Sequence, residues 1–461
     1  MGQQIPLYRR PLPNTARHPA GGTEYVVSGE CRQGWCSRAC DWSPRGIVEG
    51  VGWNGDLPRL PQFAKGCAGS RGRIKGSSIH GSMRHIAVAT TSRADWGHVE
   101  PVLRMLGQED GVRTSLLVGG AHLEPRFGRT IVDVERAGYE VAAEIPFLAA
   151  DDSDLGMAEG IGRATTGFAR VFQALKPDIV LLIADRFEMM APASAAMAMR
   201  IPIAHIEGGE ISEGAIDQQV RDALTKMSHL HFVPTAEAQA RVIAMGEEPW
   251  RVFVSGAPSL DHLVMDTLPD RCAVEAAIGQ SLDPPPVVIA FHPTTIHRDT
   301  TDEAVVFFEA IEACSQPLVF CFPNADAGYR RIIEMAESIC ERRSDAVLRV
   351  NLDHLVYWAL VREAACLAGN SSSGIMEAAS FGIPAVNVGV RQQGRTRARN
   401  VIDAPVIASE IQAAIRRGVD PTFRSSLSGM VNPYGTGQAS ALIVKILASV
   451  DLDAKLLQKR C

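Results

Sequence analysis

Three carboxylates and one guanidinium follow short apolar runs in the middle of the chain, and here we expect chemistry. Two apolar runs end in Asp185 and in Glu207, and Asp217 and Arg221 begin the helical segment that comes next. Open α/β sheets bind their ligands at the carboxyl ends of strands. The acids are therefore candidates for proton transfer and charge stabilisation. The alternative is that Arg186 and Arg221 only neutralise them.

A second group of residues has the chemistry to bind phosphate. The sequence NSSSG places the hydroxyls of Ser371 and Ser372 and the backbone of Gly374 between a predicted strand and a predicted helix. Backbone N–H groups at a helix start attract anions. Arg391 and Arg395 follow in the segment RQQGR, and their two guanidiniums can bind a diphosphate bidentately. Glu377 could accept hydrogen bonds from ribose hydroxyls, or could simply complement the helix dipole.

Four further polar residues lie at predicted strand ends or in a glycine-rich loop. Arg93 and Asp95 follow the first strand, His122 lies in the loop GGAHLEPRFGRT, and His292 ends the first strand of the second half. Arg93 and Asp95 could instead form an ion pair of little consequence. A single histidine is usually structural, but two that flank one cleft favour a role there.

Strand-like and helix-like segments alternate from residue 83 onward, which predicts parallel sheets with helices on both faces. We expect an α/β protein of two doubly wound, Rossmann-like domains with a cleft between them, over 83–258 and 259–435. A C-terminal helix and tail follow over 436–461. We also expect single helices over 127–137 and 374–381.

Residues 1–82 differ from the rest of the chain. They hold 14 of the 41 Gly and 7 of the 27 Pro and carry a net charge of +6, against −12 for the remainder. Cys31, Cys36, Cys40 and Cys67 lack the paired spacing of a zinc site. We expect either a disordered extension or upstream sequence with translation beginning at Met83, and we favour the second.

The composition of the chain and the motifs that it lacks exclude several classes of protein. The net charge of −6 does not indicate nucleic acid or an anionic membrane. No apolar run approaches the ~18–20 residues of a membrane span, no secretory signal is visible, and scattered Cys fit a reducing cytoplasm. There is no G-x-G-x-x-G, Walker A, zinc signature or G-x-S-x-G triad pattern. We expect a cytoplasmic protein without cofactor, metal, nucleic-acid or membrane partner.

Several long blocks together resemble the hydrolysing UDP-N-acetylglucosamine 2-epimerases of sialic-acid-type sugar biosynthesis. The resemblance covers residues 84–435 and includes TSRADWGHVEPVL, ADRFEMMA, FHPTT, FPNADAG and GNSSSGIMEAASFGIPAVNVGVRQQGR. The non-hydrolysing branch has a sequence of the type HVEAGLRS where this chain reads HIEGGEISEG. That segment indicates the hydrolysing branch.

The resemblance implies a glycosyltransferase-B fold, a homodimer or homotetramer, and a nucleotide sugar with UDP held mainly by the second domain. It implies loss of UDP from C1, removal of the C2 proton to give 2-acetamidoglucal, and hydration to N-acetylmannosamine. The matching positions are Asp185, Glu207, Asp217 and Arg221 for catalysis, Arg93, Asp95, His122 and His292 in the cleft, and Ser371, Ser372, Glu377 and Arg391 for the nucleotide.

Two departures from the family pattern leave the C4 and C6 substituents of the substrate sugar undetermined. Ala184 replaces the glycine of the usual GDRFE, and Gln218 replaces the second Asp of the commoner IDD. A UDP- or GDP-linked 2,4-diacetamido-trideoxyhexose is therefore an alternative substrate. A glycosyltransferase of the same fold and a nucleotide-sugar-binding protein without catalysis are the alternatives outside the family's chemistry.

Overall fold

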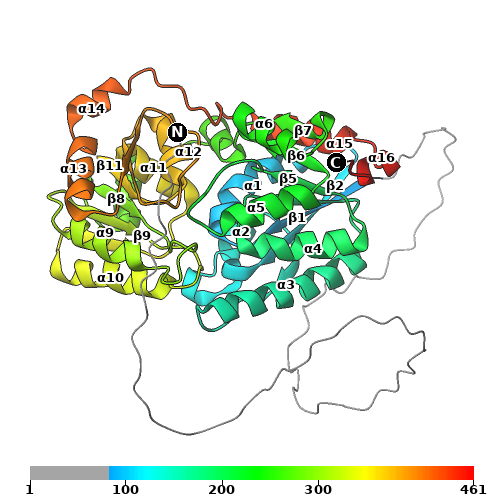
Figure 1. The fold of residues 1–461 in the computed structure, drawn as a ribbon, viewed down its shortest axis with the longest axis horizontal. Helices are drawn as coiled ribbons and strands as arrows, with labels where there is room; N and C mark the ends of the chain where they lie inside the picture. Colours follow the sequence, from blue (N-terminus) through cyan, green and yellow to red (C-terminus); the bar gives the residue numbers. More distant parts are fainter. Residues whose placement is uncertain (1–82, 461) are drawn as a thin grey trace, which may run out of the picture. The chain divides into compact units, whose positions relative to one another are not determined.

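The computed structural model describes residues 83–460, so the expectations for residues 1–82 lie outside the described residues. The first half is a parallel sheet in the order β3-β2-β1-β4-β5-β6-β7 (Figure 1). Its strands are β1 (Arg84–Thr90), β2 (Val112–Gly119), β3 (Val141–Ile145), β4 (Ile179–Ile183), β5 (Ile203–Ile206), β6 (Leu230–Val233) and β7 (Val252–Val254). Its helices are α1 (Arg93–Leu106), α2 (Ile131–Arg136), α3 (Asp154–Leu175), α4 (Met190–Met199), α5 (Asp217–Met227) and α6 (Ala236–Ala244).

The second half repeats the same strand order in a six-stranded parallel sheet, β10-β9-β8-β11-β12-β13. Its strands are β8 (Val287–Ala290), β9 (Leu318–Cys321), β10 (Ala346–Arg349), β11 (Cys366–Gly369), β12 (Ala385–Val388) and β13 (Val401–Ala404). The helices are α7 (His262–Met265), α8 (Arg271–Ile278), α9 (Asp302–Glu312), α10 (Tyr329–Arg342), α11 (His354–Glu363), α12 (Ser373–Met376), α13 (Ala408–Gly418) and α14 (Pro421–Ser426). Two doubly wound sheets confirm the predicted fold class.

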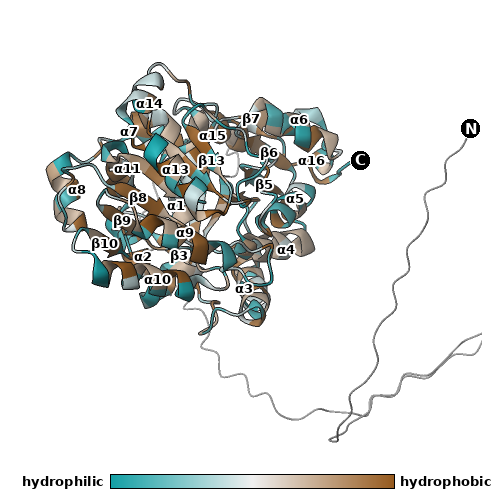
Figure 2. Ribbon diagram, turned by 60° about the vertical axis from the view of Figure 1, so that its left-hand side comes forward, coloured by the Kyte–Doolittle hydropathy of each residue, from teal (hydrophilic) through white to brown (hydrophobic). Residues whose placement is uncertain are grey.

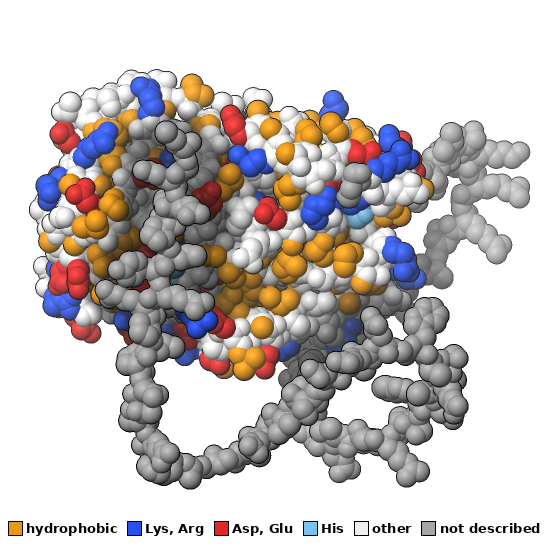
Figure 3. All heavy atoms as spheres, in the orientation of Figure 1, with side chains coloured by type: hydrophobic (Ala, Val, Ile, Leu, Met, Phe, Trp, Pro, Cys, Tyr) orange, Lys and Arg blue, Asp and Glu red, His pale blue; other side chains and the backbone are white. Residues whose placement is uncertain are grey.

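The central strands of both sheets are apolar along their whole length because helices cover both faces. Every residue of β4 and of β8 is buried. Figure 2 shows mostly hydrophobic strands surrounded by helices that carry both hydrophilic and hydrophobic residues. Acidic and basic side chains are interspersed over the face seen in Figure 3. In the part of the chain that the structure describes, every helix is too short or too polar to cross a membrane.

The C-terminal helices α15 (Ala439–Ser449) and α16 (Ala454–Leu457) return to the first sheet, as Figure 1 shows. Ile443, Val444 and Leu447 of α15 are buried in the hydrophobic core of the first half. The chain therefore crosses back after completing the second sheet. The domain boundaries that we expect from the sequence remain a prediction.

Most expected elements are present, but some differ, and the short helices α7, α8, α14 and α16 are not among the expected elements. The helix expected over 127–137 is a 3₁₀ turn (Pro125–Phe127) followed by α2, because Gly128 takes a left-handed φ of +83° between them. The helix expected over 374–381 is α12 followed by a 3₁₀ turn (Ala378–Phe381). Strands β6 and β13 are absent from the sequence-based expectation. Both are only four residues long, and polar residues interrupt their apolar patterns (LHFV and VIDA).

Candidate active site

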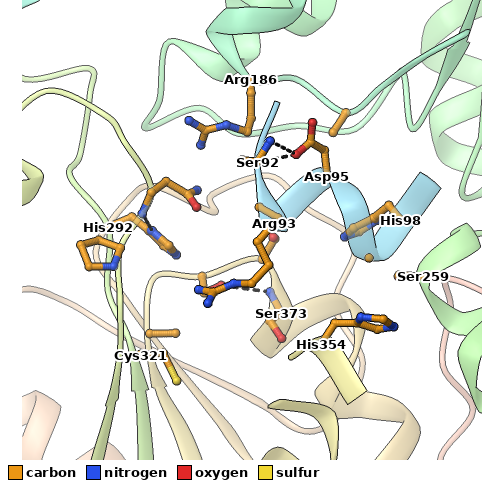
Figure 4. Close-up of a pocket in the computed structure, with 18 of the residues that line it drawn as sticks. Ser92, Arg93, Asp95, His98, Arg186, Ser259, His292, Cys321, His354 and Ser373 are labelled. Atoms are coloured by element: carbon orange, nitrogen blue, oxygen red, sulfur yellow. Dashed lines mark hydrogen bonds between the residues drawn. The ribbon is translucent and has the colours of Figure 1, made fainter. Parts of the chain in front are cut away.

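A pocket lies between the carboxyl ends of the two sheets (Figure 4). Segments that follow β1, β4 and β5 line it from the first half, and segments that follow β8, β9 and β11 line it from the second half. Strand order reverses between β1 and β4 and again between β8 and β11. Doubly wound sheets bind their ligands at such reversal points, so the topology itself creates this site.

Asp185 follows β4 and lines the pocket. Its Oδ2 pairs with the guanidinium of Arg221, and Nη2 of Arg395 lies 3.6 Å from the same oxygen. Arg221 is buried and also donates to the carbonyl of Glu210 at 2.9 Å and to the hydroxyl of Ser212 at 3.0 Å. Arg221 therefore fixes Asp185 from behind the pocket wall.

The backbone is left-handed at the ends of both acid-bearing strands. Ala184 has a φ of +61° and Glu207 has a φ of +66°. A side chain in this region costs about 1–2 kcal/mol. Hydrogen bonds to neighbouring strands hold both residues in place, since the Ala184 N–H donates to Ile206 at 3.0 Å and the Glu207 N–H donates to Phe232 at 2.7 Å. The left-handed backbone thus explains the family's glycine at position 184, because glycine adopts this conformation without strain.

Glu207 contacts His98, and the same histidine also faces Glu377 of the second half. Nδ1 of His98, on α1, lies 2.7 Å from Oε1 of Glu207, and its Nε2 lies 3.6 Å from Oε1 of Glu377. Burial opposes ionisation of Glu207, but the charge and hydrogen bond of His98 outweigh it and lower the pKa of this carboxyl. Glu207 is therefore held ionised.

Asp217 is the first residue of α5 and lines the same pocket. Its Oδ2 lies 3.4 Å from Nη2 of Arg391, which belongs to the second half. Burial raises the pKa of Asp217 to about 6, despite the opposing charge of Arg391. A carboxyl group that titrates near neutral pH can exchange protons with a substrate at working pH.

A buried charge cluster lies behind Asp217. Nη2 of Arg186 donates to Glu188 at 2.7 Å and lies 3.6 Å from Asp326 of the second half. Glu188 is fully buried, and burial raises its pKa. Arg186 itself lines the pocket. The neutralisation that the sequence leaves open thus holds for Arg221 with Asp185, whereas Arg186 pairs with Glu188.

The second half contributes hydroxyls and guanidiniums. Ser371 and Ser372 line the pocket just before α12, and the Ser373 N–H donates to Oγ of Ser371 at 3.3 Å. Arg391 reaches the same place, where its Nη1 donates to the carbonyl of Asn370 at 3.2 Å. Positive charge and hydroxyls thus face the acids across the pocket, which is the donor set that a diphosphate requires.

His292 and Arg93 line the pocket from opposite halves, as Figure 4 shows. Nδ1 of His292 accepts the N–H of Asn324 at 3.2 Å, so the neutral ring carries its proton on Nε2. Burial and the charge of Arg391 lower the pKa of His292 well below its usual value. Nη1 of Arg93 donates to Oδ1 of Asn351 at 2.9 Å and so joins the two halves.

Two residues expected to be catalytic, His122 and Arg221, do not line the pocket. Both ring nitrogens of His122 contact threonine hydroxyls, with Nε2 3.0 Å from Thr90 and Nδ1 2.6 Å from Thr130. Burial lowers the pKa of His122 to about 4, so the ring is neutral. Both His122 and Arg221 are enclosed by protein groups, so their expected catalytic roles remain predictions.

Two residues expected to bind substrate have structural tasks that the sequence does not reveal. The carboxylate of Asp95 accepts the N–H and hydroxyl groups of Thr91 and Ser92, at 2.6–3.2 Å, and caps α1. A Cβ on Gly374 would lie 3.3 Å from Cβ of Ala385. Gly374 thus lets α12 pack closely on the sheet and does not line this pocket.

Comparison with known proteins decides the family. Residues 104–448 match the family model described as UDP-N-acetylglucosamine 2-epimerase, which is three quarters of the chain. This protein belongs to the UDP-N-acetylglucosamine 2-epimerase family. The resemblance inferred from the sequence blocks is confirmed.

Two family members and one solved structure illustrate the likeness. The chain is 33% identical to the UDP-N,N'-diacetylbacillosamine 2-epimerase (hydrolyzing) of Legionella pneumophila, over 82% of this chain and 99% of that one. It is 32% identical to the GDP/UDP-N,N'-diacetylbacillosamine 2-epimerase (hydrolyzing) of Campylobacter jejuni, over 81% and 98%. The UDP-GlcNAc 2-epimerase of Neisseria meningitidis, solved bound to UDP-GlcNAc, superposes with a TM-score of 0.66 at 18% identity, over 79% of this chain and 99% of that one. The last comparison supports the fold.

Sequence reasoning about this family member missed His98 and Asp326, and it assigned Arg395 to phosphate alone. His98 lies within the block TSRADWGHVEPVL, but nothing in the sequence indicates that α1 brings it between two acids. Arg395 stands in the segment RQQGR that was read for phosphate, yet it approaches Asp185. Asp326 follows β9, and the general rule for strand ends could have identified it.

Proposed function

We propose that this member of the UDP-N-acetylglucosamine 2-epimerase family is a hydrolysing 2-epimerase of a UDP-linked 2-acetamido hexose. One observation carries the proposal. Three carboxyl groups in three different environments, Asp185, Glu207 and Asp217, line one side of a pocket whose other side holds Ser371 and Arg391. The acids can transfer protons and stabilise positive charge on a sugar, and the serine and arginine can bind its diphosphate.

The first step breaks the bond between C1 of the sugar and the UDP oxygen. The electron pair leaves with UDP, and Arg391 and the hydroxyls of Ser371 and Ser372 receive the growing negative charge. Positive charge develops at C1 and the ring oxygen, where a nearby carboxylate stabilises it. Glu207 is proposed for this task because His98 keeps it ionised.

The second step takes the proton from C2 and forms the double bond of a 2-acetamidoglucal. Asp217 is proposed as the base, since its pKa of about 6 leaves it ionised at neutral pH but able to return a proton. Water then adds across the double bond. Its hydroxyl bonds to C1, and Asp185, which is ionised beside Arg221 and Arg395, is proposed to pass the water's proton to C2 on the face opposite to the one from which Asp217 took it. Asp217 then releases the proton taken from C2 to solvent. The net reaction consumes one water and yields UDP and the free sugar with inverted C2.

Two sugars are candidates for the hexose. The family description and the sequence resemblance favour N-acetylglucosamine, which would give N-acetylmannosamine. The Legionella and Campylobacter relatives, at 33% and 32% identity, are named for N,N'-diacetylbacillosamine, a 2,4-diacetamido-trideoxyhexose. We propose the diacetamido sugar as the preferred substrate, on the strength of these two relatives.

A competition between the two UDP-sugars tests the proposal. The protein is incubated with each substrate, and UDP release is followed by anion-exchange chromatography to obtain kcat/KM. A site shaped for one hexose is expected to favour it by at least about 10-fold, the effect of one well-placed contact of ~1–3 kcal/mol. A preference for UDP-N-acetylglucosamine would reverse the assignment of the sugar. Absence of UDP release from both would contradict the activity.

A further inference from the structure

His98 is the one histidine in the described pocket that lies between two carboxylates. It stands on α1, lines the pocket, and has a side chain only 16% exposed. Its two ring nitrogens face Oε1 of Glu207 at 2.7 Å and Oε1 of Glu377 at 3.6 Å. An ionised carboxylate only accepts hydrogen bonds, so the 2.7 Å contact places a proton on Nδ1. The contact of Nε2 with Glu377 is longer than a hydrogen bond, but a second carboxylate at 3.6 Å favours a proton on Nε2 as well. The geometry therefore favours an imidazolium.

The charges around His98 come from three different elements. Glu207 follows β5, Glu377 follows α12, and Asp95 lies on α1 itself. Burial alone would lower the pKa of His98, but the charge and hydrogen bond of Glu207, with Glu377 and Asp95 nearby, raise it to about 9. The histidine is thus charged across the physiological range.

The two carboxylates belong to opposite halves of the pocket. Glu207 is fixed through its backbone N–H, which donates to Phe232 of β6, and it belongs to the acid-bearing wall. Glu377 is held by the hydroxyl of Ser259 at 3.2 Å and belongs to the wall with the serines. Within residues 83–460, these contacts of Glu377 all use Oε1, which leaves Oε2 to accept a hydroxyl from a ligand.

We infer that His98 is a positioning residue whose imidazolium joins Glu207 and Glu377 and so couples nucleotide binding in the second half to orientation of the charge-stabilising acid in the first. The inference rests on the proposed function for the roles of the two acids. A neutral ring has one donor and one acceptor, so it can hold only one of the carboxylates and faces the other with a lone pair. Loss of the proton would therefore uncouple the two walls.

Two substitutions separate charge from shape. His98→Gln keeps a polar side chain without a charge, whereas His98→Lys keeps a cation that titrates higher, near pH 10.4 in an unperturbed lysine. His85→Gln is the matched control, because His85 is the second residue of β1, at the opposite end of the strand from the pocket, and contacts Ser115. Each protein is assayed between pH 6 and 10 for kcat, for KM with the UDP-sugar, and for UDP affinity by calorimetry.

The expected pattern differs for each protein. In the wild type, kcat falls and UDP binds less tightly as the pH rises through about 9. His98→Gln lowers kcat/KM about 10- to 100-fold, the effect of losing one charge-assisted hydrogen bond, and lacks the alkaline transition. His98→Lys recovers most of the loss and moves the transition to higher pH, and His85→Gln keeps the wild-type profile.

Calorimetry keeps this inference separate from the proposed activity. If the wild type releases no UDP but the His98 variants change UDP affinity in the expected pattern, the activity is wrong and the coupling stands. If His98→Gln binds UDP with the wild-type pH dependence, or if His98→Lys is as impaired as His98→Gln, the coupling is wrong whatever the activity proves to be.

Discussion

Glu207 is buried and Asp217 is half-buried in one pocket, yet their surroundings move their pKa values in opposite directions. His98 lowers the pKa of Glu207, whereas burial raises that of Asp217 to about 6. Paired acids with separated pKa values are the usual basis for dividing proton transfer from charge stabilisation. The opposite shifts support our proposal of proton transfer for Asp217 and charge stabilisation for Glu207.

Replacement of Asp217 tests this division at the residue scale. If Asp217 is the base, kcat/KM of the wild type falls as the pH drops below about 6, because the carboxyl becomes protonated. Asp217→Asn should lower kcat by about 10²- to 10⁴-fold and remove that transition. The readout is UDP release between pH 4.5 and 8.

Asp222→Asn is the matched control, since Asp222 lies on the same helix and accepts from Gln218 at 3.0 Å outside the pocket. It should keep both the rate and the transition. An Asp217→Asn variant with wild-type kcat would remove Asp217 from the proton path.

The sequence allowed prediction of these acids because a general rule places chemistry at strand ends, and Asp185 and Glu207 both follow that rule. It did not allow prediction of His98, whose role depends on α1 meeting a segment almost 280 residues later in the chain. It also did not allow prediction of the contacts of His122, because the two threonines that enclose its ring come from separate segments. Residue type and spacing thus indicate the acids but not their partners.

At the scale of elements, the turn after β4 carries the most informative departure from the family pattern. Ala184 holds a left-handed φ of +61°, a conformation that glycine adopts without strain. The departure was visible in the sequence, but its cause was not. The family's glycine could be explained by a close contact with the sugar or by a left-handed backbone. The φ of position 184 supports the second explanation.

Ala184→Gly is expected to raise the free energy of unfolding by up to about 1 kcal/mol. Relief of about 1–2 kcal/mol of strain is partly offset by the ~0.4–1 kcal/mol by which glycine stabilises the unfolded chain. The comparison is Ala193→Gly inside α4, which should lower stability by about 1 kcal/mol. Urea denaturation measures both. Equal losses in the two variants would show that the turn is not strained.

At the scale of the whole described molecule, charged side chains join the two sheets across the pocket. Arg93 reaches Asn351, Arg391 reaches Asp217, and His98 stands between Glu207 and Glu377. The two-domain architecture was predictable from the alternation of strands and helices. The return of α15 to the first sheet was not, because an apolar helix does not specify which core it joins.

The proposed chemistry predicts that hydrogen at C2 is exchanged with solvent in every turnover. The most direct test is incubation with the UDP-linked diacetamido sugar, and with UDP-N-acetylglucosamine, in deuterated water, followed by NMR and mass spectrometry. We expect equal amounts of UDP and free sugar, with inverted configuration and one deuterium at C2. Free sugar that retains its C2 configuration and hydrogen, or a UDP-linked epimer without UDP release, would contradict a hydrolysing 2-epimerase.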